Sequence, residues 1–249
     1  GIPDGNVLGF DPYMVNTYND DELRELVAFH QIDLKLKERN PDEPLSKKTT
    51  EEYLELIDKD EELNKIYDRF VNKLKMPETY TEEGKQVKGI EAYLPKNIYE
   101  CDKHHIAVAN DIMKSREKLS KNGKFHAMLA TKNIPEAIAY YQLFKQYHPS
   151  LNVAAVFDSN IDNSDGGIVR EDAINEMLTD YNAQYGMNYK LANYALYKKD
   201  VAKRLAHKKP YIGIENDHNQ QIDLLIVVTQ MLTGYDSKWV NTLYVDKLL

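Results

Sequence analysis

The stretch Ile222-Asp223-Leu224-Leu225-Ile226-Val227-Val228 decides the fold class of this chain. It has the length of a strand, and a strand that is apolar without alternation is buried on both faces. Similar apolar runs occur at 125–131, 152–157 and 242–245. Segments with helical periodicity lie between these runs. The pattern predicts an α/β fold, in which helices flank a parallel sheet.

The region before this pattern is charged and mostly helical. Apolar residues recur at helical spacing over 20–39, and Asn19 or Asp20 is the predicted N-cap. Thr49 and Glu52 form a capping-box pair ahead of a predicted helix over about 50–75. Residues 1–10 predict a turn and a short strand, and the stretch 76–98 shows little periodicity. We therefore expect an N-terminal strand and charged helical extension over 1–100, and the α/β domain over 101–249.

Four helices are expected within 101–249. The first covers 101–119 and is followed by a turn before the 125–131 strand. Asn133 caps the second, with Pro135 in its first turn and Glu136 completing a capping box. The others are predicted at about 170–183 and 188–206. Tyrosines in these helices fall at helical spacings, which favours packing in the core over stacking against nucleic-acid bases.

Composition limits the class of protein. The 249 residues are 42% apolar, enough for a folded core, and carry a net charge of −8. Residues 1–100 hold 14 basic and 23 acidic side chains, so the acidity belongs to them, while 101–249 is close to neutral. The single cysteine, Cys101, excludes an internal disulfide and fits a reducing compartment such as the cytoplasm. No apolar run is long enough to span a membrane.

Familiar catalytic and metal-binding motifs are absent from the sequence. It contains no P-loop, G-x-G-x-x-G, H-E-x-x-H or G-x-S-x-G pattern. Asp158, Asn160 and Asp162 resemble the start of a calcium loop, but the required glycine and final glutamate are missing. His104 and His105 are adjacent on a helix and point about 100° apart, so they cannot easily bind one metal ion. We interpret them as ordinary core or surface histidines. We predict no catalytic and no metal-binding residue.

In a parallel sheet, the functional loops follow the carboxyl ends of the strands. These are the segments 130–134, 157–167 and 229–238, and the last contains Thr229-Gln230-Met231-Leu232-Thr233-Gly234-Tyr235-Asp236. Gly234 would allow close approach of a ligand, Thr233 could donate to a phosphate, and Asp236 could accept from a ribose hydroxyl. The alternative is an ordinary connection in which Asp236 caps a helix.

The segment from Ile222 to Asp236 resembles motif V in the second RecA-like domain of superfamily-two translocases. It is most similar to the motor (R) subunit of type I restriction enzymes, with Tyr235 where Phe is usual. The resemblance extends over most of the chain and is weakest over 40–100. Its other parts are Asn241–Lys247, the linker-like Asp4–Phe10, the motif IV strand Lys124–Thr131, and Tyr194–Arg204 with Tyr197, Asp200, Val201 and Arg204 as its core.

This resemblance implies roles for particular residues. In such motors ATP lies between two RecA-like lobes and DNA crosses the top of both. Gly234 and Asp236 would then face the nucleotide. Residues near the DNA backbone would be Thr233, Thr229 and Gln230 from motif V, and Thr131, Lys132 and Asn133 from the end of motif IV.

The resemblance also implies partners and missing parts. ATP and Mg²⁺ would be bound mainly by a first RecA-like lobe, which this sequence does not contain, and the domain is expected to stop before motif VI. The parent would be the ATP-dependent motor of a type I site-specific deoxyribonuclease, with double-stranded DNA and the modification and specificity subunits as partners. The fragment alone is expected to be inactive. Two alternatives remain: the second lobe of another superfamily-two helicase, and a non-catalytic Rossmann-like binding module.

Overall fold

The computed structural model describes residues 17–41, 48–95, 98–157, 167–228 and 237–246. The chain forms two compact units, an N-terminal unit of residues 1–104 and a C-terminal unit of residues 105–249. The strand predicted within 1–10 lies outside the described residues.

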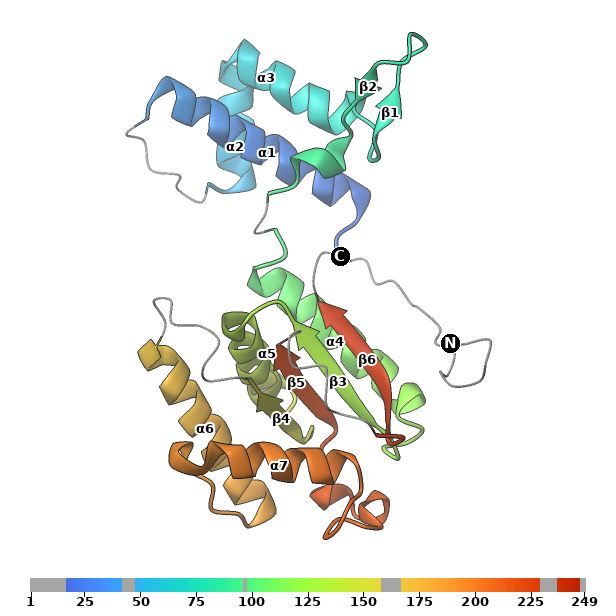
Figure 1. Cartoon of the computed structure of the whole chain (residues 1–249). Helices are drawn as coiled ribbons and strands as arrows, with labels where there is room; N and C mark the ends of the chain where they lie inside the picture. The colour runs from blue at the N-terminus through green and yellow to red at the C-terminus, as the bar shows by residue number, and fades with distance from the viewer. Residues whose placement is uncertain (1–16, 42–47, 96–97, 158–166, 229–236, 247–249) are drawn as a thin grey trace. The chain divides into compact units, whose positions relative to one another are not determined.

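Helices dominate the N-terminal unit (Figure 1). Asn19 begins α1 (Asp20–Arg39), and its side chain accepts a hydrogen bond from the N–H of Glu22 at 2.9 Å. The Glu22 carboxylate accepts in turn from the Asn19 N–H at 3.1 Å, which completes a capping box. The predicted helix is confirmed, with Asn19 as its N-cap. Short β1 (Thr79–Tyr80), β2 (Gln86–Val87) and the 3₁₀ turn η3 (Ile90–Tyr93) fall in the stretch without periodicity.

The single helix predicted over 50–75 is wrong. The structure has α2 (Thr50–Lys59), α3 (Glu61–Asp68) and the π-helical turn η2 (Arg69–Lys73). Asp60 separates α2 from α3 with an extended backbone, and its carboxylate caps α3 by accepting from the N–H groups of Glu62 and Leu63. This break allows α2 and α3 to share one apolar cluster with α1, which consists of Phe29, Ile32, Tyr53, Ile57 and Leu63, with the rings of Phe29 and Tyr53 stacked.

Replacing Asp60 with alanine should destabilise this helical packing. The change removes the cap of α3 and one of the two acidic partners of Arg39, whose guanidinium also donates to Glu62. Hydrogen bonds from Arg39 lower the pKa of Asp60 to about 2, so the carboxylate is charged at neutral pH. We expect the melting temperature followed by far-UV circular dichroism to fall by a few degrees. Exposed Asp58 in α2 is the matched control, and equal melting of the two variants would contradict this role.

The C-terminal unit is built on a parallel sheet in the order β4-β5-β3-β6 (Figure 1). Its strands are β3 (His126–Thr131), β4 (Val153–Val156), β5 (Leu224–Val228) and β6 (Val240–Asp246). All residues of β3 and β5 are buried, so both faces of the central sheet are covered. The α/β class and the four predicted strands are confirmed, within two residues at each strand end.

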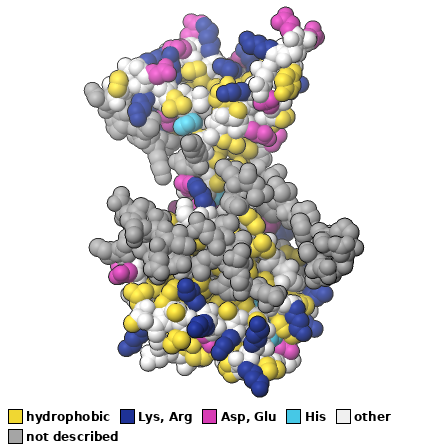
Figure 2. All heavy atoms as spheres, viewed as in Figure 1, with side chains coloured by type: hydrophobic (Ala, Val, Ile, Leu, Met, Phe, Trp, Pro, Cys, Tyr) yellow, Lys and Arg dark blue, Asp and Glu magenta, His cyan; other side chains and the backbone are white. Residues whose placement is uncertain are grey.

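Four helices accompany this sheet: α4 (Asp102–Leu119), α5 (Ile134–Tyr147), α6 (Gly167–Tyr185) and α7 (Tyr194–Leu205). The 3₁₀ turn η4 (Leu191–Asn193) precedes α7, so the α-helix begins later than predicted. Leu129, Ile226 and Val156 from the strands join Tyr140 and Phe144 of α5 in one apolar core. Figure 2 shows charged side chains on the outer surface of this unit, with Lys and Arg over the region of α7.

Candidate functional site

The carboxyl edge of the sheet brings together the ends of three strands. Thr131 at the end of β3 pairs with Val228 at the end of β5 and with Asp246 at the end of β6. Val228 is the last described residue before the segment 229–236. The predicted site residues Thr229, Gln230, Thr233, Gly234 and Asp236 all lie outside the described residues, so their roles stay predictions.

The predicted motif IV residues lie at this carboxyl edge. Thr131 is completely buried, and its hydroxyl is within donating distance of the carbonyls of Asn133 and Val227, at 3.2 and 3.3 Å. Lys132 is exposed, and Asn133 caps α5 by accepting from the N–H of Glu136 at 2.9 Å. The hydroxyl of Thr131 therefore holds two strand ends together. Lys132 provides the positive charge at this end of β3.

The sequence predicts that Glu136 completes a capping box with Asn133. In the structure its side chain makes a different contact. Its carboxylate accepts from the N–H of Lys132 at 3.0 Å, and its side chain is buried. A phosphate at this turn would compete with that carboxylate for the Lys132 N–H, and the negative charge already complements the helix dipole. Sequence spacing alone does not show this competition, because it depends on the path of the chain before Asn133.

Asp246 is a second residue at this edge that sequence analysis missed as a site residue. Its carboxylate accepts from the hydroxyl of Tyr140, 2.5 Å away, which connects β6 to α5. The two residues are 106 positions apart in the chain. The carboxyl edge therefore carries the Glu136 and Asp246 carboxylates as well as the Lys132 ammonium, and all three lie near the point where β5 ends.

The motif-like stretch in α7 packs inward. Tyr197 donates to the carbonyl of Ala155 at 2.8 Å, and Tyr194 donates to the carbonyl of Phe157 at 3.1 Å. Both hydroxyls therefore hold α7 against β4 and the residue that follows it. Three further tyrosines of the predicted helices are also buried: Tyr140, Tyr141 and Tyr181. The prediction that these side chains serve packing is confirmed.

Arg204 is the most unusual residue in the core of this unit. It is completely buried, and its guanidinium lies 4.0 Å from the ring centroid of Tyr185 and 4.1 Å from that of Tyr211. It donates to the Gln220 carbonyl at 2.7 Å and lies 3.6 Å from the buried carboxylate of Asp200. The Asp200 and Arg204 pair of the sequence motif is thus a buried ion pair that fixes α7.

Comparison with known proteins identifies the family. The family described as T1R_D3-like, type I restriction enzyme subunit R domain 3, matches residues 123–249, about half of the chain. The chain belongs to this family. It is 29% identical over 188 residues to the type I restriction enzyme SauMRSORF196P endonuclease subunit of Staphylococcus aureus (strain MRSA252). It is 31% identical over 189 residues to the SsaAORF53P endonuclease subunit of Staphylococcus saprophyticus.

The relationship to type I restriction enzyme R subunits confirms the resemblance seen in the sequence. The matches cover 72% of this chain and 19% of each relative, so the chain spans about a fifth of the length of the curated relatives it matches. Membership of the R-subunit family does not support the alternative that the chain is the second lobe of another superfamily-two helicase.

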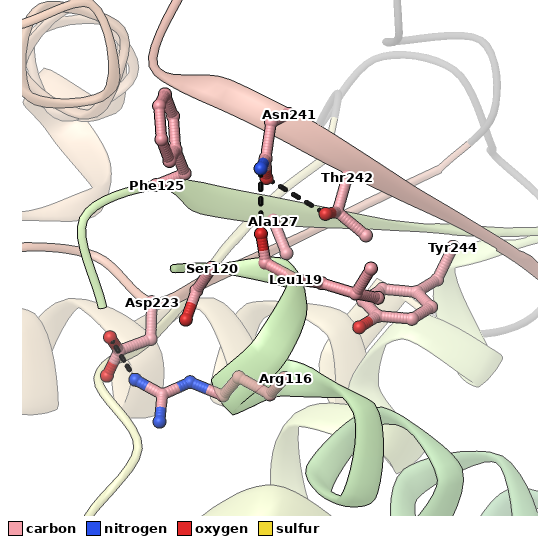
Figure 3. Close-up of a pocket in the computed structure, with 9 residues that line it drawn as sticks. All are labelled: Arg116, Leu119, Ser120, Phe125, Ala127, Asp223, Asn241, Thr242 and Tyr244. Carbon is pink, nitrogen blue, oxygen red and sulfur yellow. Dashed lines mark hydrogen bonds and ion pairs between the residues drawn. The ribbon is translucent and has the colours of Figure 1, made fainter. Parts of the chain in front are cut away.

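The amino edge of the sheet in this R-subunit domain contains a small cavity (Figure 3). Its volume of about 10 Å³ is room for roughly one water molecule. Buried Asp223 accepts from the Arg116 guanidinium at 2.5 Å and from the N–H of Asn152 at 2.9 Å. These contacts join α4, β5 and the start of β4. The size of the cavity and its internal ion pair indicate a structural role.

Two buried histidines and a half-buried carboxylate lie in contact with one another at the same edge of the R-subunit domain. His126 Nδ1 is 2.6 Å from the carbonyl oxygen of Ile222, and its Nε2 is 2.8 Å from Nε2 of His207. His207 Nδ1 is 2.9 Å from the carboxylate of Glu215, and its ring stacks on Trp239 at 4.1 Å. Burial lowers the pKa of His126 to about 4 and also lowers the pKa of His207. His126 is therefore neutral at physiological pH.

No group of three or more His, Cys, Asp or Glu side chains suited to a metal ion occurs in the part of the chain that the structure describes. His104 contacts the Thr17 hydroxyl at 2.8 Å, and His105 packs against the ring of Tyr140. Both are buried, as expected for ordinary core histidines. Most of the calcium-like turn falls in 158–166, outside the described residues. Among the described helices of this R-subunit domain, none has the length and apolar character needed to cross a bilayer.

Proposed function

We propose that this chain is the second RecA-like lobe of the ATP-dependent DNA translocase in a type I restriction enzyme R subunit. Membership of the R-subunit family is the observation that carries the proposal. The register of the sheet supports it, because the end of the motif IV strand at Thr131 pairs with Val228, from which the motif V segment continues. The residues proposed for DNA contact therefore follow two strands that end side by side at the carboxyl edge of the sheet.

Each motif has a physical role in this proposal. Lys132, with Asn133 beside it, holds the phosphate backbone of double-stranded DNA at the end of β3, where buried Thr131 fixes the two strand ends. Thr229, Gln230 and Thr233 from motif V contact the same backbone. Contacts to phosphates position DNA without reading its sequence, as a motor that moves along DNA requires. Recognition of the DNA sequence is left to a separate specificity subunit.

Gly234 and Asp236 complete the nucleotide side of the lobe in this proposal. ATP hydrolysis supplies the free energy, and a first RecA-like lobe of the same subunit binds most of the ATP and the Mg²⁺. Gly234 allows the backbone to approach the nucleotide, and Asp236 accepts hydrogen bonds from it. Because the nucleotide contacts both lobes, its binding and hydrolysis close and open the cleft. The assembly includes the modification and specificity subunits and operates in the cytoplasm.

The test is made in the full-length R subunit with the single variants Asp236→Ala and Thr233→Ala. We expect DNA-stimulated ATP hydrolysis to fall at least tenfold in each, equivalent to about 1.4 kcal/mol of transition-state stabilisation. Circular dichroism should be unchanged. Lys59→Ala is the control, because this exposed lysine lies on α2 in the N-terminal unit and pairs only with Glu55 among the described residues.

Wild-type hydrolysis rates in both variants would remove motif V from the mechanism. The 249-residue chain by itself should show no ATP turnover above the blank. A non-catalytic scaffold would differ in a further respect: in a fusion of this chain to its first lobe, DNA would bind with the same affinity whether or not an ATP analogue is present. The proposed function requires that these two affinities be linked.

A further inference from the structure

The outer face of α7 and the turns on either side of it carry an unusual concentration of lysine. We call this set the α7 lysine surface; it consists of Lys190, Lys198, Lys199, Lys203, Lys208 and Lys209. Five of these side chains are exposed and Lys198 is half-buried over the ring of Tyr194. Figure 2 shows dark-blue side chains gathered over the region that Figure 1 labels α7.

No acidic side chain balances this positive charge within 186–212. Asp200 is the one acidic residue in that range of the sequence, and it is buried. Its carboxylate accepts from the hydroxyls of Tyr181 and Tyr211 and lies beside the guanidinium of Arg204. Within the described parts of the chain, the six lysines form no ion pair. The paired lysines lie elsewhere, for example Lys65 with Glu61.

The core dictates that these lysines face outward. Tyr194, Tyr197, Val201 and Leu205 are buried and define the inner face of α7. Lys199 and Lys203 are four positions apart, so they lie one above the other on the opposite face. The apolar side chains of the inner face are buried in the core. Exposed apolar side chains on α7 are therefore scattered, such as Leu196. This arrangement suits a polyanion better than insertion into a lipid surface.

An aromatic stack with further lysines adjoins the C-terminal end of α7. The rings of His207 and Trp239 lie 4.1 Å apart and nearly parallel, and Phe125 lies 6.0 Å from Trp239. Lys238 and Lys124 are exposed next to these rings in the sequence. Glu215 is the carboxylate that faces His207, and it is engaged with the Nδ1 atom of that ring. The positive surface therefore continues past the end of the helix.

The C-terminal end of this surface lies away from the predicted site residues Thr131 and Lys132. His207, just after α7, contacts His126, the first residue of β3, and Leu205 accepts from Ser237 ahead of β6. Thr131 and Lys132 lie at the other end of β3. The C-terminal end of the α7 lysine surface is thus placed at the amino edge of the sheet, whereas Thr131 and Val228 end their strands at the carboxyl edge.

We propose that the α7 lysine surface is a second binding site for the phosphate backbone of duplex nucleic acid, independent of the carboxyl edge. Lysines without ionic partners need not break an ion pair within the protein when they bind phosphates. Each phosphate that they neutralise also releases condensed counterions. Binding would be insensitive to base sequence. This site is additional to the proposed motif IV and V contacts and does not depend on them.

The test titrates the 249-residue chain with a fluorescent DNA duplex at several salt concentrations between about 50 and 200 mM. In the triple variant Lys198→Ala, Lys199→Ala and Lys203→Ala, we expect at least a tenfold loss of affinity at the lowest salt concentration. The slope of log K against log salt should become shallower by about 2 to 3, since each lost phosphate contact removes about 0.9. The corresponding Lys→Arg triple variant keeps the charge and should retain binding.

The matched control removes the same charge from three exposed lysines in the N-terminal unit. Lys59, Lys65 and Lys73 each pair with an acidic side chain, and their triple alanine variant should change affinity less than twofold. An equal loss in this control would overturn the proposal, because net charge alone would then explain binding. Binding to vesicles of anionic lipid without binding to the duplex would overturn it as well.

Lys132→Ala separates this inference from the proposed function. If duplex affinity falls in Lys132→Ala and stays unchanged in the α7 triple variant, the α7 surface is not a binding site and the carboxyl-edge site stands. If affinity falls only in the α7 triple variant, the α7 inference is supported and Lys132 loses its assigned contact. Losses in both variants support two sites.

Discussion

Replacing Arg204 with alanine is expected to lower the free energy of unfolding of the C-terminal unit by about 3 to 5 kcal/mol. The side chain is completely buried between the rings of Tyr185 and Tyr211. Its removal leaves the Asp200 carboxylate buried without its cationic partner and leaves the Gln220 carbonyl without a donor. Removing one partner of a buried ion pair costs more than the pair contributes, because the remaining charge stays buried without a counter-charge.

The measurement can use the single tryptophan of the chain. Trp239 stacks on His207 in the C-terminal unit, so its fluorescence during urea unfolding reports on that unit. Lys203→Ala is the control for stability, because it changes an exposed neighbour on the same helix. The double variant Arg204→Met with Asp200→Asn should cost less than the sum of the single changes. A loss below about 1 kcal/mol for Arg204→Ala would show that the buried pair contributes little.

Lowering the pH from about 6.5 to about 4 is expected to remove about 3 kcal/mol of stability from the same unit. Burial lowers the folded-state pKa of His126 to about 4, whereas the unfolded chain titrates near the ordinary value for histidine. The unfolded state therefore binds more protons in this range. The stabilisation is fully present above the unfolded pKa and is lost as the pH falls towards the folded pKa.

His207 changes stability in the same direction, since burial also lowers its pKa, although Glu215 opposes the shift and Lys238 adds to it. The measurement is the urea midpoint of Trp239 fluorescence at several pH values. His126→Gln removes the titrating group and keeps a donor for the Ile222 carbonyl, so its midpoint should vary less with pH. Parallel pH profiles for the wild type and this variant would show that His126 does not control the acid response.

Part of the candidate site follows from sequence because it depends on local pattern. The apolar run 125–131 predicts β3, and the Asn133 cap predicts the start of α5, so Thr131, Lys132 and Asn133 were expected at a carboxyl edge. The structure places them there. Their contact with DNA stays a prediction. The competition from Glu136 and the contact of Tyr140 with Asp246 were not predicted, since they depend on how the chain folds around that edge.

The sequence by itself determined the α/β class, the four strands, the ends of α1 and the family, because these depend on residue periodicity, caps and motifs within short stretches. Only the tertiary structure decided the strand order, which places β5 between β4 and β3 although it follows both in the chain. It also decided the break at Asp60, where Arg39 of α1 pairs with a carboxylate 21 residues away. The contact of His126 with His207 joins residues 81 positions apart. Such contacts depend on burial and charge pairing between distant segments, which the pattern of any one segment does not contain.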